Sequence, residues 1–190
     1  MTWTPIVTLA LALLTLVALV AVAVLIAARV LAPLSDGFSQ LDAWLRRQLP
    51  EGGARLAWLV AVVATLGSLY FSEVAHFEPC RLCWYQRIAM YPLTVILGVG
   101  ALRGDRSVVR YALPLALIGA PISLYHYAIE WFPALESGAC DPRNPCSLVW
   151  FREFGFITLP FMAGTAFALI GTLLLFAART GTSPSPGERS

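Results

Sequence analysis

The stretch "FEPCRLCWYQRIAMYPL", residues 77–93, decides how this chain is organised. It places two cysteines, Cys80 and Cys83, directly before an apolar run that contains Arg87. Two cysteines separated by two residues are typical of redox chemistry or of a metal site. An apolar run is typical of a membrane helix, so the stretch predicts a dithiol at a membrane surface and a charged side chain inside the membrane.

The rest of the chain is apolar enough to surround this stretch with further membrane helices. Of its 190 residues, 58% are hydrophobic and only 13% are charged. Uncharged runs span residues 1–28, 56–72, 88–102, 111–129 and 154–178. A helix needs about 20 apolar residues to cross a bilayer, and the third run reaches that length only if it extends back past Arg87 to Leu82. We therefore expect an all-α integral membrane protein with five membrane helices.

Four parts are expected along the chain. Residues 1–34 form an additional N-terminal membrane helix, which lacks a basic start and exceeds the roughly 7–15 apolar residues of a signal-peptide core, so we expect it to be retained. Residues 35–54 form a short segment at the inner face, and residues 55–179 form a four-helix bundle core. Residues 180–190 form a polar, disordered cytoplasmic tail.

The segment at the inner face contains "FSQLDAWLRRQL", in which apolar and polar residues alternate at helical spacing. The apolar side holds Phe38, Leu41, Leu45 and Leu49, and the polar side holds Gln40, Asp42, Arg46 and Arg47. This pattern predicts a short amphipathic helix that lies in the membrane interface and contacts lipid. The following "LPEGG" is expected to end it, with the second membrane helix starting near Arg55.

The arginines orient the chain, which contains no lysine. If the first helix ends inside, the inner side holds Arg29, Arg46, Arg47, Arg55, Arg103, Arg106, Arg110, Arg179 and Arg189. The outer side then holds only Arg81, Arg87, Arg143 and Arg152. Basic residues favour the cytoplasmic side, so we expect the N-terminus outside, the C-terminus inside and all four cysteines on the outer face. Disulfides persist on that face, and the net charge of +2 does not indicate a nucleic-acid partner.

The setting of Cys80 and Cys83 favours a reactive thiolate. Both lie at a helix N-terminus, where unpaired N–H groups favour negative charge, and Arg81 and Arg87 add positive charge nearby. A c-type haem site would need a histidine directly after the second cysteine, where Trp84 stands. A redox-active dithiol, a zinc site that uses all four cysteines and a structural disulfide remain open at this point.

A second cysteine pair, Cys140 and Cys146, lies in the proline-rich outer loop sequence "CDPRNPC". Such a loop is expected to be exposed to water and can present a disulfide to a partner protein. It can also bring that disulfide near the first pair. Two cysteine pairs on one membrane face therefore indicate a relay by thiol–disulfide exchange.

Two ionisable residues are predicted at one depth inside the membrane. Arg87 follows Cys83 by one helical turn, and His126 precedes Glu130 by another, so each lies roughly 6 Å below the outer helix ends. Such residues are often functional, although Arg87 could also extend to the headgroups and His126 could be a packing residue. A membrane-soluble carrier such as a quinone could reach this depth, and its carbonyl oxygens could accept hydrogen bonds there.

Three sequence blocks resemble the DsbB/BdbC family of disulfide-bond-formation proteins. They are "CRLCWYQRIAMYPL", "LYHYAIEWFP" and "CDPRNPC" followed by "FGFITLPF", and the resemblance extends over roughly residues 55–179. It implies a four-helix core that oxidises a thioredoxin-like periplasmic dithiol oxidase, similar to DsbA, and reduces ubiquinone or menaquinone. The implied enzyme is a protein-dithiol:quinone oxidoreductase without a metal.

The resemblance also implies a role for each site residue. Cys83 would face the quinone, with Cys80 as its disulfide partner. Arg87 matches the quinone-interacting arginine of the family, and His126 matches a histidine near the quinone. Cys140 and Cys146 match the pair that meets the partner protein, with Cys140 as the point of attack.

The chain departs from the family pattern in three places. Gln86 stands where some members carry glutamate, and the second pair is closer together than in the best-known member, as in a shorter-loop branch. Residues 1–54 lie outside the family core, and the resemblance implies no function for them beyond anchoring or partner contact. Two alternatives are a quinone reductase that resembles vitamin K epoxide reductases and a membrane protein that binds a metal through four thiolates.

Overall fold

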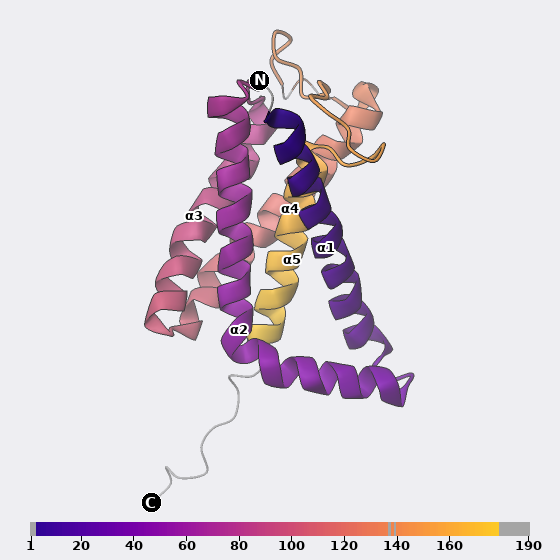
Figure 1. Cartoon of the computed structure of the whole chain (residues 1–190), viewed down its shortest axis with the longest axis vertical. Helices are drawn as coiled ribbons and strands as arrows, with labels where there is room; N and C mark the ends of the chain where they lie inside the picture. The colour runs from indigo at the N-terminus through magenta and orange to yellow at the C-terminus, as the bar shows by residue number, and fades with distance from the viewer. Residues whose placement is uncertain (1–2, 137, 139, 179–190) are drawn as a thin grey trace, which may run out of the picture.

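The computed structural model describes residues 3–136, 138 and 140–178 and consists of helices joined by short loops (Figure 1). The long helices are α1 (Thr4–Leu31), α2 (Asp36–Leu69), α3 (Arg81–Arg103), α4 (Val109–Trp131) and α5 (Leu159–Ala178). The short ones are η1 (Tyr70–Val74), η2 (Arg106–Val108) and η3 (Pro133–Leu135). Among these residues β-structure is limited to two isolated bridges, which confirms the all-α class. The predicted tail, residues 180–190, lies outside the described residues, as do Arg179 and Arg189.

Four helical segments in the described part of the chain are long and apolar enough to cross a membrane: α1, residues Gly52–Val74, α4 and α5. The protein is therefore an all-α membrane protein. Helix α3 is as long as α4, with 23 residues, but Gln86 and Arg87 make its first half more polar. It nevertheless packs between α2 and α4 and runs beside them (Figure 1). The fifth membrane crossing stays a prediction, which this packing supports.

Helix α2 joins the segment at the inner face to the second membrane span. The sequence predicted a helix end at "LPEGG", which is wrong, because α2 continues through it. Figure 1 shows α2 turning from across the bundle to along it. A Cβ atom on Gly53 would lie 3.3 Å from the carbonyl oxygen of Leu173, so the bend brings α2 close to α5.

The first half of α2 is amphipathic, as predicted, with one exception. Leu45 and Leu49 are buried, but so is Asp42, which the helical pattern placed on the polar side. Arg46 Nε donates to Asp42 Oδ2 at 2.7 Å, and Arg29 Nη1 of α1 lies 3.9 Å from the same oxygen. The carboxylate therefore connects α1 to the inner-face segment. The boundaries after residues 34 and 54 stay predictions.

The core lies between all five long helices. Its fully buried side chains include Leu93 and Leu97 of α3 and Ile170 and Leu174 of α5. Helix α4 crosses α5 closely at Gly119, where any Cβ atom would collide with the ring of Phe167. This contact keeps the upper part of α4 against the bundle.

The outer helix ends differ from the predicted runs. Helix α2 passes into the π-helical turn η1, and His76, with φ of 58°, reverses the chain so that the N–H of Phe77 donates to the carbonyl of Phe71 at 2.8 Å. Helix α5 begins at Leu159 and not at Phe154, because residues 154 and 155 both have positive φ and form a turn. Both cysteine pairs and the start of α1 lie at this end, opposite the inner-face segment (Figure 1).

Candidate active site

Cys80 is the N-cap of α3, so its sulfur lies beside the unpaired N–H groups of the first turn. The N–H of Cys83 donates to Cys80 Sγ at 3.4 Å, and the two sulfur atoms are 3.2 Å apart. Both cysteines are free thiols; Cys80 is buried and Cys83 is half-buried. The predicted dithiol at a helix N-terminus is therefore present in its reduced form.

The surroundings of Cys80 favour its thiolate. The thiol of Cys83 donates to it and has the largest effect, and His126 adds a hydrogen bond and charge. Burial opposes them, yet together they lower the pKa of Cys80 from 9.0 to about 4. The reduced pair therefore carries its negative charge on the sulfur of Cys80. A thiolate is the nucleophile in disulfide exchange, so this is the reactive atom of the pair.

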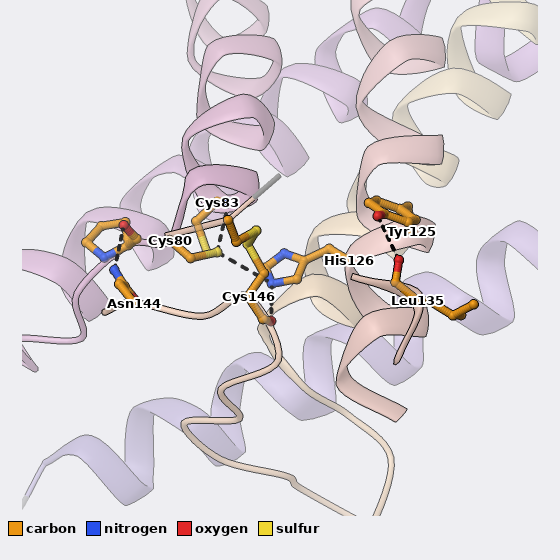
Figure 2. The surroundings of a disulfide bond; sticks show 9 residues. Cys80, Cys83, Tyr125, His126, Leu135, Asn144 and Cys146 are labelled. Carbon is orange, nitrogen blue, oxygen red and sulfur yellow. Dashed lines mark hydrogen bonds between the residues drawn. A yellow bond between two sulfur atoms is a disulfide. The ribbon is translucent and has the colours of Figure 1, made fainter. Parts of the chain in front are cut away.

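His126 connects the two cysteine pairs. Its Nε2 lies 3.6 Å from Cys80 Sγ and 3.1 Å from the carbonyl oxygen of Cys146 (Figure 2). A carbonyl only accepts hydrogen bonds, so Nε2 must carry the proton. The ring is buried, with 3% of its surface exposed. One N–H group is thus shared between a sulfur of the inner pair and the backbone of the outer pair.

The outer pair forms a disulfide, Cys140–Cys146, that packs on the inner pair. The loop was expected to be exposed to water and able to present this disulfide to a partner, but only 6% of Cys140 and 1% of Cys146 are exposed. Asn144 Nδ2 donates to the carbonyl of Pro79 at 3.3 Å, directly before Cys80 (Figure 2). The tip of the loop is exposed, but the sulfur atoms face the bundle.

The start of the same outer segment is also fixed to α4. The hydroxyl of Tyr125 donates to the carbonyl of Leu135 in η3 at 3.1 Å (Figure 2). Tyr125 precedes His126, so one turn of α4 holds both the entry to the segment and the backbone of Cys146. The position of the loop over Cys80 is therefore specified by side-chain contacts at both ends.

Arg87 is fixed against α2 by two hydrogen bonds to Ser68. Its Nε donates to Ser68 Oγ at 3.0 Å, and its Nη2 donates to the Ser68 carbonyl at 3.1 Å. Its guanidinium carbon lies 5.2 Å from the centroid of the Trp84 ring. The charge is therefore held in place one turn below Cys83.

Cys83 and Arg87 line a single cavity of about 370 Å³ between the helices. Gln86 also lines it, and its Nε2 donates to Ser123 Oγ at 3.1 Å. Cavities of roughly 300–1,000 Å³ are typical of small-molecule sites. In the described part of the chain, His126 is not among the residues that line this cavity. The three residues predicted to contact the quinone therefore lie in two places. Cys83 and Arg87 line the cavity, and His126 contacts Cys80.

An aromatic cluster borders the outer end of this cavity. Phe77 stacks on Phe71, with ring centroids 5.6 Å apart, and on Trp150, with ring centroids 4.6 Å apart. All three line the cavity. Trp150, which lies in the segment before α5, therefore contributes to the site.

Sequence reasoning missed several site residues for a common reason. Ser68, Ser123 and Asn144 are small polar residues that give no motif, and their partners lie 19 to 65 positions away in the chain. A serine inside an apolar membrane run is the one signal that could have indicated Ser68, because such a hydroxyl needs a partner.

The metal alternative is limited by the outer disulfide. Cys140 and Cys146 are bonded to each other, so a site with four thiolates is not formed in this structure. The ligand atoms of Cys80, Cys83 and His126 lie within 4.8 Å of one another. These three could hold a metal only by occupying the same sulfur atoms that exchange requires.

A helical membrane protein that packs a reduced dithiol on a loop disulfide is a thiol–disulfide oxidoreductase. Residues 52–177 match the family described as disulfide bond formation protein DsbB, and the chain belongs to this family. It is 52% identical to disulfide bond formation protein C of Bacillus subtilis (strain 168), over 60% of this chain and 83% of that protein. It is 47% identical to a probable disulfide formation protein of Coxiella burnetii (strain CbuK_Q154), over 69% of this chain and 90% of that protein. No solved structure matches the chain.

Proposed function

We propose that the protein re-oxidises a thioredoxin-like, DsbA-like dithiol protein on the periplasmic side of the inner membrane and passes the electrons to a quinone. The net reaction converts a partner dithiol and a quinone into a partner disulfide and a quinol. Two electrons and two protons leave the partner, and the quinol receives both. The observation that carries this proposal is that Cys83 and Arg87 line one apolar cavity, while Cys80 contacts the second pair through His126.

The first exchange takes place at the outer pair. A partner thiolate attacks Cys140, the Cys140–Cys146 bond breaks, and Cys146 leaves as a thiolate. The second partner thiol then attacks the mixed disulfide, which releases the oxidised partner and leaves Cys140 and Cys146 reduced. Since both sulfur atoms are buried in the present structure, the loop must move outward before a partner can reach Cys140.

The second exchange passes the electrons inward. Cys146 attacks Cys80 of an oxidised inner pair, and Cys83 leaves as a thiolate. Cys140 then attacks Cys146, which restores the outer disulfide and reduces Cys80. An oxidised outer pair and a reduced inner pair, as found here, are the products that this step would leave, which supports the proposed order. The Nε2–H of His126 lies where it can stabilise the charge that forms on Cys80.

The final step is oxidation of the inner dithiol by ubiquinone or menaquinone. Arg87 supports it because its guanidinium can donate to a carbonyl oxygen that becomes anionic on reduction. Cys83 supports it because it is the inner cysteine whose side chain borders the cavity. When Cys80 and Cys83 form a disulfide, their two electrons pass to the quinone, and the proton of Cys83 and one proton from solvent complete the quinol.

A visible absorption spectrum tests this function. Mixing the purified protein with quinone and a reduced DsbA-like protein should produce a transient charge-transfer band, because Cys83 is released as a thiolate against an electron-poor ring while Cys80 is bonded to Cys146. Cys83→Ser should give no band and no quinol, while Cys140 should still form a mixed disulfide with the partner. Normal quinone reduction by Cys83→Ser would contradict the proposal.

A further inference from the structure

Helix α1 lies outside the residues that match the family, 52–177, yet it forms part of the cavity wall. Six of its residues line the cavity beside Cys83 and Arg87: Leu11, Leu14, Thr15, Val17, Ala18 and Ala21. We propose that α1 is the wall that receives the isoprenoid tail of the quinone and so makes the enzyme selective for long-tailed quinones. This inference rests on the proposed function and adds a role for a helix that the family core does not contain.

The cavity has a polar side and an apolar side, as a quinone with an isoprenoid tail requires. Arg87 and Gln86 place charged and polar groups on the α3 side. The α1 side is apolar, and its one hydroxyl, on Thr15, donates to the carbonyl of Leu11 at 2.8 Å. A quinone has a polar ring and a hydrocarbon tail, so the ring fits the α3 side and the tail fits α1.

The shape of the α1 wall also fits a long chain. From Leu11 to Ala21 the wall extends about 15 Å along the helix, at 1.5 Å per residue. Helices α1 and α3 start at the same end of the bundle (Figure 1), and Cys83 and Arg87 lie in the first two turns of α3, so the wall runs from the level of these residues toward the middle of the bundle. A tail lying along it would leave the ring beside Cys83.

Helix α1 is fixed in this position at both ends. Near the outer end, a Cβ atom on Gly67 would lie 3.1 Å from Leu11 Cδ1, so the glycine permits a close approach of α1 to α2. At the inner end, Asp42 accepts from Arg46 at 2.7 Å and lies 3.9 Å from Arg29 Nη1. Between these points Leu25 is buried in the main core. These contacts make α1 part of the bundle and not only an anchor.

Substitutions on α1 test the inference without touching the thiols. Ala18→Phe adds a ring inside the cavity. Ala23→Phe is the matched control, because Ala23 is exposed on the same helix and does not line the cavity. Each variant is assayed with a ubiquinone that carries a long isoprenoid tail, with the same ring lacking a tail, and by single-turnover oxidation of the partner.

We expect Ala18→Phe to raise the KM for the long-tailed quinone by about tenfold or more, since overfilling a packed site is strongly unfavourable. The KM for the tailless ring and the rate of partner oxidation should not change, and Ala23→Phe should behave as wild type throughout. Equal KM values for the two variants, or an equal loss on both quinones, would overturn the inference.

Loss of partner oxidation would reveal that Ala18→Phe does not fold. In that case a second variant tests the inference. Leu14→Ala removes apolar surface from the wall and adds no bulk. It should raise the KM for the long-tailed quinone about two- to tenfold and leave the tailless ring unaffected. No change for either quinone would overturn the inference. Failure of the proposed function itself looks different, because the wild-type protein would then reduce neither quinone.

Discussion

At the residue scale, the site depends on the side chains of Arg87 and His126. The sequence indicated that both are important, but it did not indicate which residues they contact. Their depth followed from helical spacing alone, because each lies one turn from a recognisable helix end. Their contacts did not follow, because Ser68 and the carbonyl of Cys146 come from distant parts of the chain. The common quinone site predicted for both residues is therefore divided by the structure.

Arg87→Ala should weaken quinone use about 10- to 150-fold, because a hydrogen bond to a charged group contributes roughly 1.5–3 kcal/mol. Arg87→Lys should recover only part of the loss, since lysine keeps the charge but lacks the planar fork. Ser68→Ala should give a smaller loss, because only one of its two contacts with Arg87 uses the side chain. The kcat and KM for quinone measure the effect, and single-turnover oxidation of the partner is the control. Equal losses in both assays would indicate misfolding.

His126→Ala should raise the pKa of Cys80 above its present value of about 4. A lowered pKa keeps the thiolate at every pH above it, so wild-type Cys80 should react with a small alkylating reagent at a constant rate between about pH 5 and 8. Losing the His126 hydrogen bond should raise the pKa by about one to two units and make the rate fall toward pH 5.

Site-resolved mass spectrometry of the alkylated protein measures this change. His126→Gln keeps an N–H donor and should restore part of the pH-independent reactivity. If His126→Ala shows the wild-type pH profile, His126 is a packing residue and does not stabilise the Cys80 thiolate.

At the element scale, the outer loop is the feature that the sequence described least well. Prolines and a short spacing predicted an exposed loop, and the tip does contain exposed residues, but Asn144 and His126 hold the sulfur atoms against the bundle. The lengths of the uncharged runs predicted the long helices well, because about 20 apolar residues are needed to cross a bilayer. They could not predict the continuous bent helix α2, because "LPEGG" indicates a helix end and the helix instead continues through it.

Loosening the loop should speed the first exchange. Asn144→Ala removes the contact with Pro79, and a neutral hydrogen bond contributes about 0.5–1.5 kcal/mol, so opening should become about 2- to 10-fold more favourable. The rate of mixed-disulfide formation with a partner that lacks its resolving cysteine measures this effect. Arg143→Ala, in an exposed neighbour, is the control and should have no effect.

Peptide mapping of the trapped complex identifies the cysteine that the partner attacks. We expect the bond at Cys140, in the wild-type protein and in Asn144→Ala. A bond at Cys80 or Cys83 would reverse the proposed order of exchange.

At the scale of the whole molecule, both cysteine pairs lie at one end of the bundle and the inner-face segment lies at the other (Figure 1). The sequence anticipated this arrangement because arginines gather at the ends of alternate apolar runs. The role of α1 could not be anticipated, because its apolar residues look alike and only the packed bundle shows which of them line the cavity. The orientation of the bundle in the membrane is a prediction from the arginines.

Labelling of intact cells tests this orientation. After mild reduction, a membrane-impermeant thiol reagent should label Cys140 or Cys146 from outside. A variant in which Ser107→Cys provides the only cysteine should be labelled only after the cells are permeabilised, because Ser107 is exposed at the opposite end. The reverse pattern would place the cysteine pairs in the cytoplasm and remove the proposed role in disulfide formation.

The central claim is that electrons pass from a protein dithiol through both cysteine pairs to a quinone. Its most direct test is rapid mixing of the quinone-loaded protein with a reduced DsbA-like partner, with quinol and partner disulfide quantified over several turnovers without oxygen. We predict equal amounts of the two products once several turnovers have passed, and in Cys83→Ser only the partner disulfide of the first exchange and no quinol. Continued formation of partner disulfide without matching quinol would contradict the account.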